Sequence, residues 1–150
     1  MANHLRRQIR DAMVTALTGL ATTGANVFGS RVYPLQDANL PALRVSTPAE
    51  EINILSMGYD RLMERTLTVT VDACVKAVSG YENSVDQIVK EVEVVLGAGA
   101  NLTLGALCKH VTLRSINTEL AGDAEKPIAV ATMNFEVLYV AALSAPDVAR

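Results

Sequence analysis

The stretch "TLTVTVDACVKA" (residues 66–77) decides the fold of this chain. Apolar and polar side chains alternate along it, and the apolar positions are Leu67, Val69, Val71, Ala73 and Val75. Alternation of apolar and polar residues is typical of a β-strand that packs one face on a core and exposes the other face to solvent. We therefore expect a sheet that is covered on one side only.

An amphipathic helix is predicted over residues 3–20, with Asn3 as its N-cap. Apolar residues recur at helical spacing along this segment: Leu5, Ile9, Ala12, Met13, Ala16, Leu17 and Leu20. Its polar face carries Arg6, Arg7, Arg10 and Asp11. The arginines precede an apolar run, as in a signal peptide, but the interspersed polar residues favour an amphipathic helix.

A second helix is predicted over residues 84–96. Ser84 and Gln87 have the spacing of a capping box, and Gly97 stands where a helix-ending glycine is expected. The apolar stripe of this helix comprises Val85, Ile88, Val89, Val92, Val95 and Leu96.

Four further segments read as strands: residues 27–33, 42–47, 107–118 and 127–140. Pro34 ends the first and Pro41 precedes the second, positions at which proline is tolerated in a sheet. We predict an α+β fold with a mostly antiparallel (mixed) sheet of about five strands. Two helices pack on one face, in the order α-β-β-β-α-β-β.

The whole chain, residues 1–150, is predicted to form a single domain. Residues 47–65 are the least regular part and are expected to form an irregular arm, as a long hairpin or a partly mobile loop. Residues 144–150 are expected to form a loose tail. The uncharged run of residues 94–108 falls short of the roughly 20 apolar residues that span a bilayer, so we expect a soluble cytoplasmic protein without membrane contacts.

The composition limits the possible functions. The formal net charge of the 150 residues is −3, which disfavours binding of nucleic acid through bulk charge. Two cysteines, Cys74 and Cys108, suit a reducing compartment and are too few for a disulfide scaffold.

Few residues suggest a catalytic, metal-binding or phosphate-binding site. Cys108 and His110 would share a strand face, but neither has the spacing of a metal site, so incidental packing is the favoured interpretation. The glycine-rich "GAGANLTLG" (residues 97–105) follows a helix instead of opening one, so it does not predict a phosphate site. We expect no enzyme, no catalytic residue, no cofactor, no metal and no small-molecule substrate. An enzyme or small-molecule binding domain that uses Cys108 and His110 is the less favoured alternative.

Charged residues of the first helix and of the loops are the candidate protein-interface residues. They are Arg6, Arg7, Arg10, Glu50, Glu51, Asp60, Arg61, Arg65, Asp123 and Glu125. The arginines of the helix are suited to phosphates, to an acidic partner or to water. They are equally suited to the Glu50–Glu51 or Asp123–Glu125 loops of a neighbouring copy, and the sequence leaves these options open.

The segment "HLRRQIRDAMVTALTGLATTGANVFGSRVYPLQDANLPALRV" (residues 4–45) resembles the start of the lambda-like minor tail protein U family, the tail terminators of long-tailed bacteriophages. The matching residues are His4, Arg7, Ile9, Asp11 and Ala12 in the helix, Thr23, Gly24 and Ala25 in the turn, Asp37 in an acidic loop, and Leu40 to Val45 in a strand.

This resemblance implies a structural protein of the virion, found at the head-proximal end of the tail after assembly in the host cytoplasm. A homo-hexameric ring would sit on the end of the tail tube, stop its polymerisation and provide the docking surface for the head–tail connector protein. The implied partners are therefore other copies of the chain, the tail tube protein and the connector. No sequence-specific nucleic acid is implied, although the ring lumen is a path for DNA. Another ring or connector protein of the head–tail junction is the alternative.

Overall fold

The computed structural model describes residues 3–29, 41–77, 79–122 and 127–150. In chain order, these residues form α1 (Leu5–Leu17), β1 (Val27–Gly29), β2 (Ala42–Ile54), β3 (Leu62–Lys76) and α2 (Tyr81–Leu96). A short 3₁₀ helix, η2 (Gly99–Leu102), then precedes β4 (His110–Gly122) and β5 (Pro127–Ala142). The expected α+β fold and its order of elements are confirmed.

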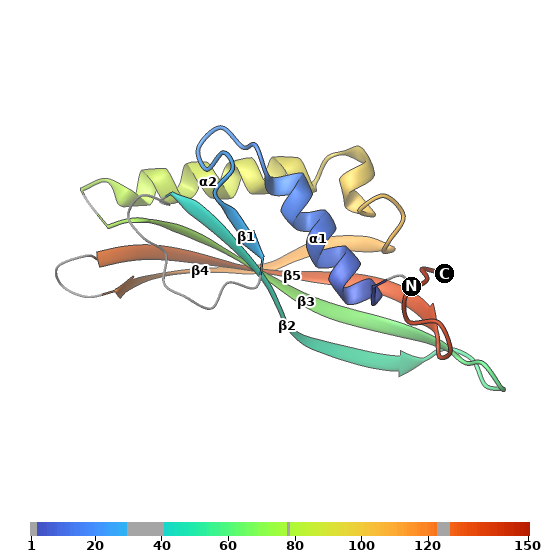
Figure 1. Cartoon of the computed structure of the whole chain (residues 1–150). Helices are drawn as coiled ribbons and strands as arrows, with labels where there is room; N and C mark the ends of the chain where they lie inside the picture. Colours follow the sequence, from blue (N-terminus) through green and yellow to red (C-terminus); the bar gives the residue numbers. More distant parts are fainter. Residues whose placement is uncertain (1–2, 30–40, 78, 123–126) are drawn as a thin grey trace.

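The five strands form one mixed sheet in the order β1-β2-β3-β5-β4. Only β1 and β2 are parallel, and the other neighbouring strands are antiparallel. The strand predicted from residues 66–77 is the centre of this sheet, because β3 pairs with β2 on one side and with β5 on the other. Both helices lie on the same side of the sheet (Figure 1), as the alternation in β3 required.

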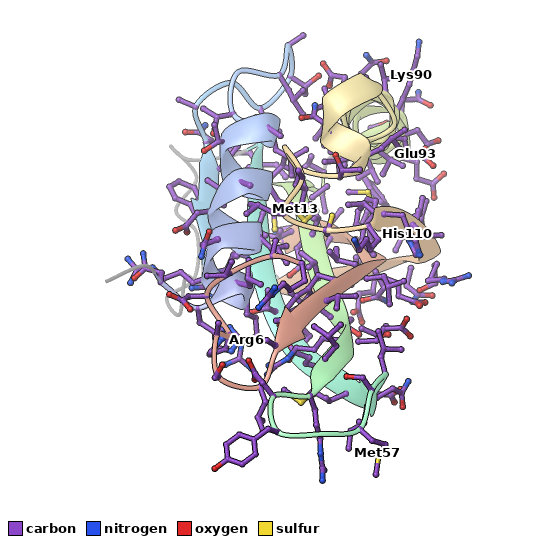
Figure 2. All side chains as sticks on the ribbon, turned by 90° about the vertical axis from the view of Figure 1, so that its right-hand side faces the viewer. Arg6, Met13, Met57, Lys90, Glu93 and His110 are labelled. Atoms are coloured by element: carbon purple, nitrogen blue, oxygen red, sulfur yellow. The ribbon has the colours of Figure 1, made fainter. Side chains whose placement is uncertain are left out.

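The core lies between the helices and the sheet. All five predicted inward positions of β3 are buried. In α1 the residues facing the sheet are Leu5, Ile9, Met13 and Leu17, each with no exposed surface. The predicted stripe of α2 is likewise buried except for Val95, which is partly buried. Figure 2 shows Met13 directed into the interior.

The other face of the sheet is polar over most of its length, with a small buried apolar cluster of Ala42, Cys74 and Val130 at one end. Cross-strand contacts connect its side chains: Thr70 Oγ1 donates to Asn134 Oδ1 (3.1 Å), and Thr132 Oγ1 donates to Asp72 Oδ1 (2.9 Å). Asn134 Nδ2 also donates to Ser115 Oγ (3.0 Å). The alternation of apolar and polar residues in β3 predicted a solvent-exposed polar face, and this hydrogen-bonded face corresponds to it.

The predicted ends of both helices need correction. His4, not Asn3, caps α1, because its Nδ1 accepts the backbone N–H of Arg6 at 3.1 Å, and α1 ends at Leu17 rather than Leu20. Helix α2 begins at Tyr81, so Ser84 lies inside the helix and forms no capping box. Gly80 precedes α2 with φ at 79°, a conformation that glycine adopts without strain.

Residues 47–65 form regular structure for most of their length. Of the two forms expected for this arm, a long hairpin and a partly mobile loop, the structure has the long hairpin. The ladder between β2 and β3 continues to the pair Ile54–Met63, and only residues 55–61 connect the strands. We call residues 49–68 the hairpin arm. The arm extends past the first turn of α1, beyond the body of the molecule (Figure 1).

A β-bulge explains why the sequence of the arm looked irregular. Ser46 pairs with Thr70 and Ala49 with Thr68, so two residues of β2, Thr47 and Pro48, lie opposite Val69 alone. The extra residue reverses the alternation of β2. A proline is tolerated here because a bulge interrupts the ladder hydrogen bonds.

The C-terminal segment is tied to the body instead of hanging loose. The carbonyl oxygen of Pro146 accepts the backbone N–H of Leu5 at 3.0 Å, and the backbone N–H of Arg150 donates to the carbonyl of Val140 at 3.0 Å. Gln8 Nε2 donates to the carbonyl of Asp147 at 2.9 Å. The C-terminal segment therefore packs against both α1 and β5.

Replacing Leu67 by Ala should lower the free energy of unfolding by about 2–5 kcal/mol, because the lost methyl groups leave a cavity under the helices. Urea denaturation followed by circular dichroism measures this change. Leu120→Ala is the matched control: Leu120 is a strand leucine that is 62% exposed, and its change should stay within about 0.5 kcal/mol. Equal losses in the two variants would contradict the one-sided core.

Candidate protein-interaction site

Four elements meet in a polar cluster at the base of the hairpin arm. Arg65 on β3 donates from its Nη1 to Glu50 Oε1 on β2 at 2.9 Å. Tyr139 on β5 donates its hydroxyl to Glu50 Oε2 at 2.8 Å, so both oxygens of this carboxylate are engaged. The Nη1 of Arg65 also lies 3.4 Å from Nε2 of His4, the cap of α1.

The side chains of this cluster are almost inaccessible to solvent. The side chains of Arg65 and Glu50 are 11% and 6% exposed, and Tyr139 is fully buried. Burial, followed by its hydrogen bond to Glu50, raises the pKa of Tyr139 above its ordinary value, so the hydroxyl keeps its proton and acts as a donor. A desolvated ion pair of this kind fixes geometry strongly, because either partner alone would be a buried unpaired charge.

The two strands of the arm are also fixed near its outer end. The backbone N–H of Leu55 donates to the carbonyl of Leu62 at 2.8 Å, and the backbone N–H of Leu62 donates to Ser56 Oγ at 2.9 Å. Asp60 accepts both the backbone N–H (3.0 Å) and the hydroxyl (2.7 Å) of Ser144, which follows β5. These two hydrogen bonds lower the pKa of Asp60 and tie the connecting turn to the C-terminal segment.

Apolar side chains are exposed at the outer end of the arm. The arm tip, residues 52–61, carries five of them: Ile52 (49% exposed), Ile54 (54%), Leu55 (53%), Met57 (84%) and Tyr59 (106%). Ile52 and Ile54 pair with Arg65 and Met63, so they lie on the side of the sheet that bears the helices, but beyond the end of α1. Figure 2 shows Met57 pointing away from the molecule. An apolar group of this kind on a projecting element typically marks a protein-interaction site.

Of the predicted interface residues that the structure describes, it brings together only Glu50 and Arg65, and it pairs them inside the chain. Arg6 and Glu51 are exposed. Arg7 is exposed and lies 3.7 Å from Asp11, while Arg10 donates to Thr47 Oγ1 at 3.2 Å. The remaining predictions fall at or near the arm tip, at Asp60 and the half-buried Arg61. Asp123 and Glu125 lie outside the described residues, as does Asp37.

Cys108 and His110 do not form a pair. Cys108 precedes β4 and is buried, whereas His110 begins β4, is exposed, and has its Nδ1 3.2 Å from Thr112 Oγ1. Burial raises the pKa of the Cys108 thiol to about 11, so the reactive thiolate is disfavoured at neutral pH. The shared strand face that the sequence suggested is therefore wrong.

In the part of the chain that the structure describes, no three His, Cys, Asp or Glu side chains are grouped to hold a metal ion. Over the same residues, neither helix has the length and hydropathy needed to cross a membrane.

Sequence reasoning missed both the arm tip and two members of the polar cluster, His4 and Tyr139. A signal for the tip was present, because Met57 and Tyr59 flank a glycine in a turn signal, and turns between strands lie on the surface. No local signal connects Tyr139 to Glu50, 89 residues away, because only the register of β2, β3 and β5 brings them together.

Replacing Arg65 by Ala should lower the free energy of unfolding by roughly 3–5 kcal/mol, since Glu50 would be left buried without its cation. Arg114→Ala is the matched control, because Arg114 pairs with Glu136 at 2.6 Å but its side chain is 58% exposed. That variant should lose no more than about 1 kcal/mol. Chemical denaturation of both variants at one ionic strength makes the comparison, and similar losses would show that the Glu50–Arg65 pair is not structurally important.

The stability of the protein should depend on the protonation of His4. Burial, then Arg65 and Arg6, lower the pKa of His4 below its ordinary value of 6.5, while Glu50 and Asp147 oppose this shift more weakly. The folded chain therefore binds this proton less readily than the unfolded chain. The stabilisation is present above pH 6.5 and is lost as the pH falls below it.

His4→Asn keeps a capping side chain and removes the titration. Denaturation curves from about pH 7.5 to about pH 5 should show a smaller decline for this variant than for the wild type. An identical decline would exclude a contribution from His4.

The chain was also compared with known proteins. No protein-family model matches it, and no curated protein matches it. Among solved structures, a chain from "Virion of native gene transfer agent (GTA) particle" is similar, at 14% sequence identity. The match covers 90% of this chain and 92% of that chain, with a TM-score of 0.37, which is too low to support a conclusion about this chain.

Proposed function

We propose that the protein is a structural component of a bacteriophage virion that works by protein–protein assembly. The observation that carries this proposal is the hairpin arm, a projecting element that is fixed at its base by a buried ion pair and exposes apolar side chains at its tip. Soluble monomers rarely expose such a group without a binding purpose. The arm therefore fits a protein whose function is to bind other subunits.

The more specific role that we propose is tail termination, and it rests on the resemblance of residues 4–45 to the lambda-like minor tail protein U family. His4 and Ile9 of that resemblance have structural roles in this chain, as the cap and a buried position of α1. Leu43 and Val45 are buried on β2. The matching residues thus contribute to the folding of the domain, and they support a shared architecture more directly than a shared partner.

In the proposed role, copies of the chain form a hexameric ring on the end of the tail tube. The ring stops the addition of tube subunits and presents a surface to the head–tail connector. The exposed Arg6 and Arg7 on α1 and the exposed Glu51 on the arm are the predicted charged residues best placed to select a partner, because charge at the rim of an interface controls encounter and register. Glu50 and Arg65 contribute by holding the arm in place.

Deletion of the gene, followed by negative-stain electron microscopy of the tails, tests this role. Loss of a terminator should give tubes longer than those of the wild type that do not join heads, because nothing stops polymerisation. Tails of normal length that fail to join heads would point to the alternative, another ring or connector protein of the junction. Normal tails joined to heads would exclude both.

Complementation of the deletion separates assembly from chemistry. A gene carrying His110→Ala should restore normal tails, because this exposed imidazole contacts Thr112 and forms no pair with the buried thiol of Cys108. Failure of a folded His110→Ala protein to complement would favour the enzyme alternative.

A further inference from the structure

A second apolar surface lies between the end of α2 and the start of β4. Here Leu96, Leu102, Val111, Leu113 and Phe135 line an open hollow of about 150 Å³, with Glu93 at its rim. Leu96 and Phe135 form its buried floor, whereas Leu102 on η2 is 44% exposed beside it. No described residue of the same chain fills this groove, which we call the α2–β4 groove.

The groove and the arm tip match in size. An apolar cavity of about 150 Å³ holds a benzene molecule, so the α2–β4 groove has room for one aromatic ring. Tyr59 offers such a ring, and its side chain is fully exposed at the outer end of the arm. Its hydroxyl would reach the rim of the groove, where Glu93 offers a carboxylate as hydrogen-bond acceptor.

The two surfaces also match in charge. Arg61 lies two residues from Tyr59, and Glu93 lies at the rim of the groove. Neither residue forms an ion pair with another described side chain; the described ion pairs involve Asp11, Glu50, Asp72 and Glu136 with other arginines. An arginine beside the aromatic anchor and a glutamate beside the hollow are complementary across an interface.

One chain cannot bring its own tip into its own groove. The start of β4 lies level with the base of the arm, because Val111 pairs with Val137 and Val137 with Leu67. From there the arm extends away from α2 and β4 (Figure 1). Figure 2, viewed from a perpendicular direction, shows Glu93 and Met57 at opposite ends of the molecule. The polar cluster and the Asp60–Ser144 contacts hold the arm in this position.

We propose that the arm tip of one copy docks in the α2–β4 groove of a second copy, with the ring of Tyr59 as the anchor. This contact joins two different surfaces of the same chain, so each copy has one tip to donate and one groove to fill. Head-to-tail contacts of this kind generate closed rings when the rotation between copies closes. The inference rests on the proposed ring and identifies the surfaces that build it.

Single-cysteine variants test the contact directly. Met57→Cys, which leaves the Tyr59 anchor intact and lies 84% exposed beside it, and Leu102→Cys are placed on separate copies, co-expressed, and treated with a short bismaleimide. The native Cys74 and Cys108 are 2% and 6% exposed and should not react. We expect a linked dimer, with mass spectrometry identifying a 57–102 peptide pair, only when both variants are present. Leu120→Cys is the matched control for Leu102→Cys, because Leu120 is exposed on β4 but does not line the groove.

Sedimentation of substituted chains measures the strength of the contact. Tyr59→Ala should weaken self-association about 30-fold, as expected for a buried aromatic hot spot. Tyr59→Phe should weaken it less, because only the hydrogen bond to Glu93 is lost, and Leu120→Ala should leave it unchanged.

Several outcomes would overturn the proposal. They are the absence of a 57–102 link in the mixture, a Met57→Cys chain that links mainly to itself, and a link from position 57 to a tube subunit in assembled tails. If tails terminate normally and no 57–102 link forms, the docking assignment fails while the terminator role stands. Overlong tails in the deletion strain, with a 57–102 link between the two cysteine variants, support both.

Discussion

The buried ion pair between Arg65 and Glu50 connects the hairpin arm to the rest of the protein. It lies where β2, β3 and β5 pass under the capped end of α1, and Tyr139 uses the second oxygen of the Glu50 carboxylate. Such a pair has little net value for stability compared with apolar side chains of similar volume, but it tolerates few alternative arrangements. Its main consequence is that the arm leaves the body in one direction. A fixed direction matters for an element that is proposed to meet another subunit.

The polar and the apolar surfaces of the molecule lie in different places. One face of the sheet is covered by helices. On the other face, cross-strand hydrogen bonds connect threonine, asparagine and charged side chains. The largest group of exposed apolar side chains lies at the arm tip, and Leu102 is exposed beside the α2–β4 groove. Face-to-face stacking of sheets would bury groups that are already hydrogen-bonded, so the two apolar surfaces favour association through the tip and the groove.

The fold could be predicted from the sequence because its signals were local. The alternation of residues 66–77 and the apolar stripes of the two helices correctly indicated which faces are buried. The candidate site was predicted poorly, because its features depend on contacts between distant residues. Charge alone suggested that Glu50 and Arg65 are on the surface, whereas the sheet register pairs them in the interior. The capping box at Ser84 failed because the left-handed Gly80 begins α2 one turn earlier.

The bulge at Thr47 and Pro48 determines which side chains the arm presents on each of its faces. Before the bulge the odd-numbered residues of β2 face the helices, and after it the even-numbered ones do, which places Glu50 against Arg65 and aligns Ile52 and Ile54 on the same side. If every residue were kept and the bulge did not form, the alternation would run unbroken and the two faces of the arm would exchange, with Glu51 in place of Glu50. In related chains, changes of arm length should therefore occur in the turn at residues 55–61 and spare the bulge. The chemistry of the tip can then vary while the attachment of the arm stays constant.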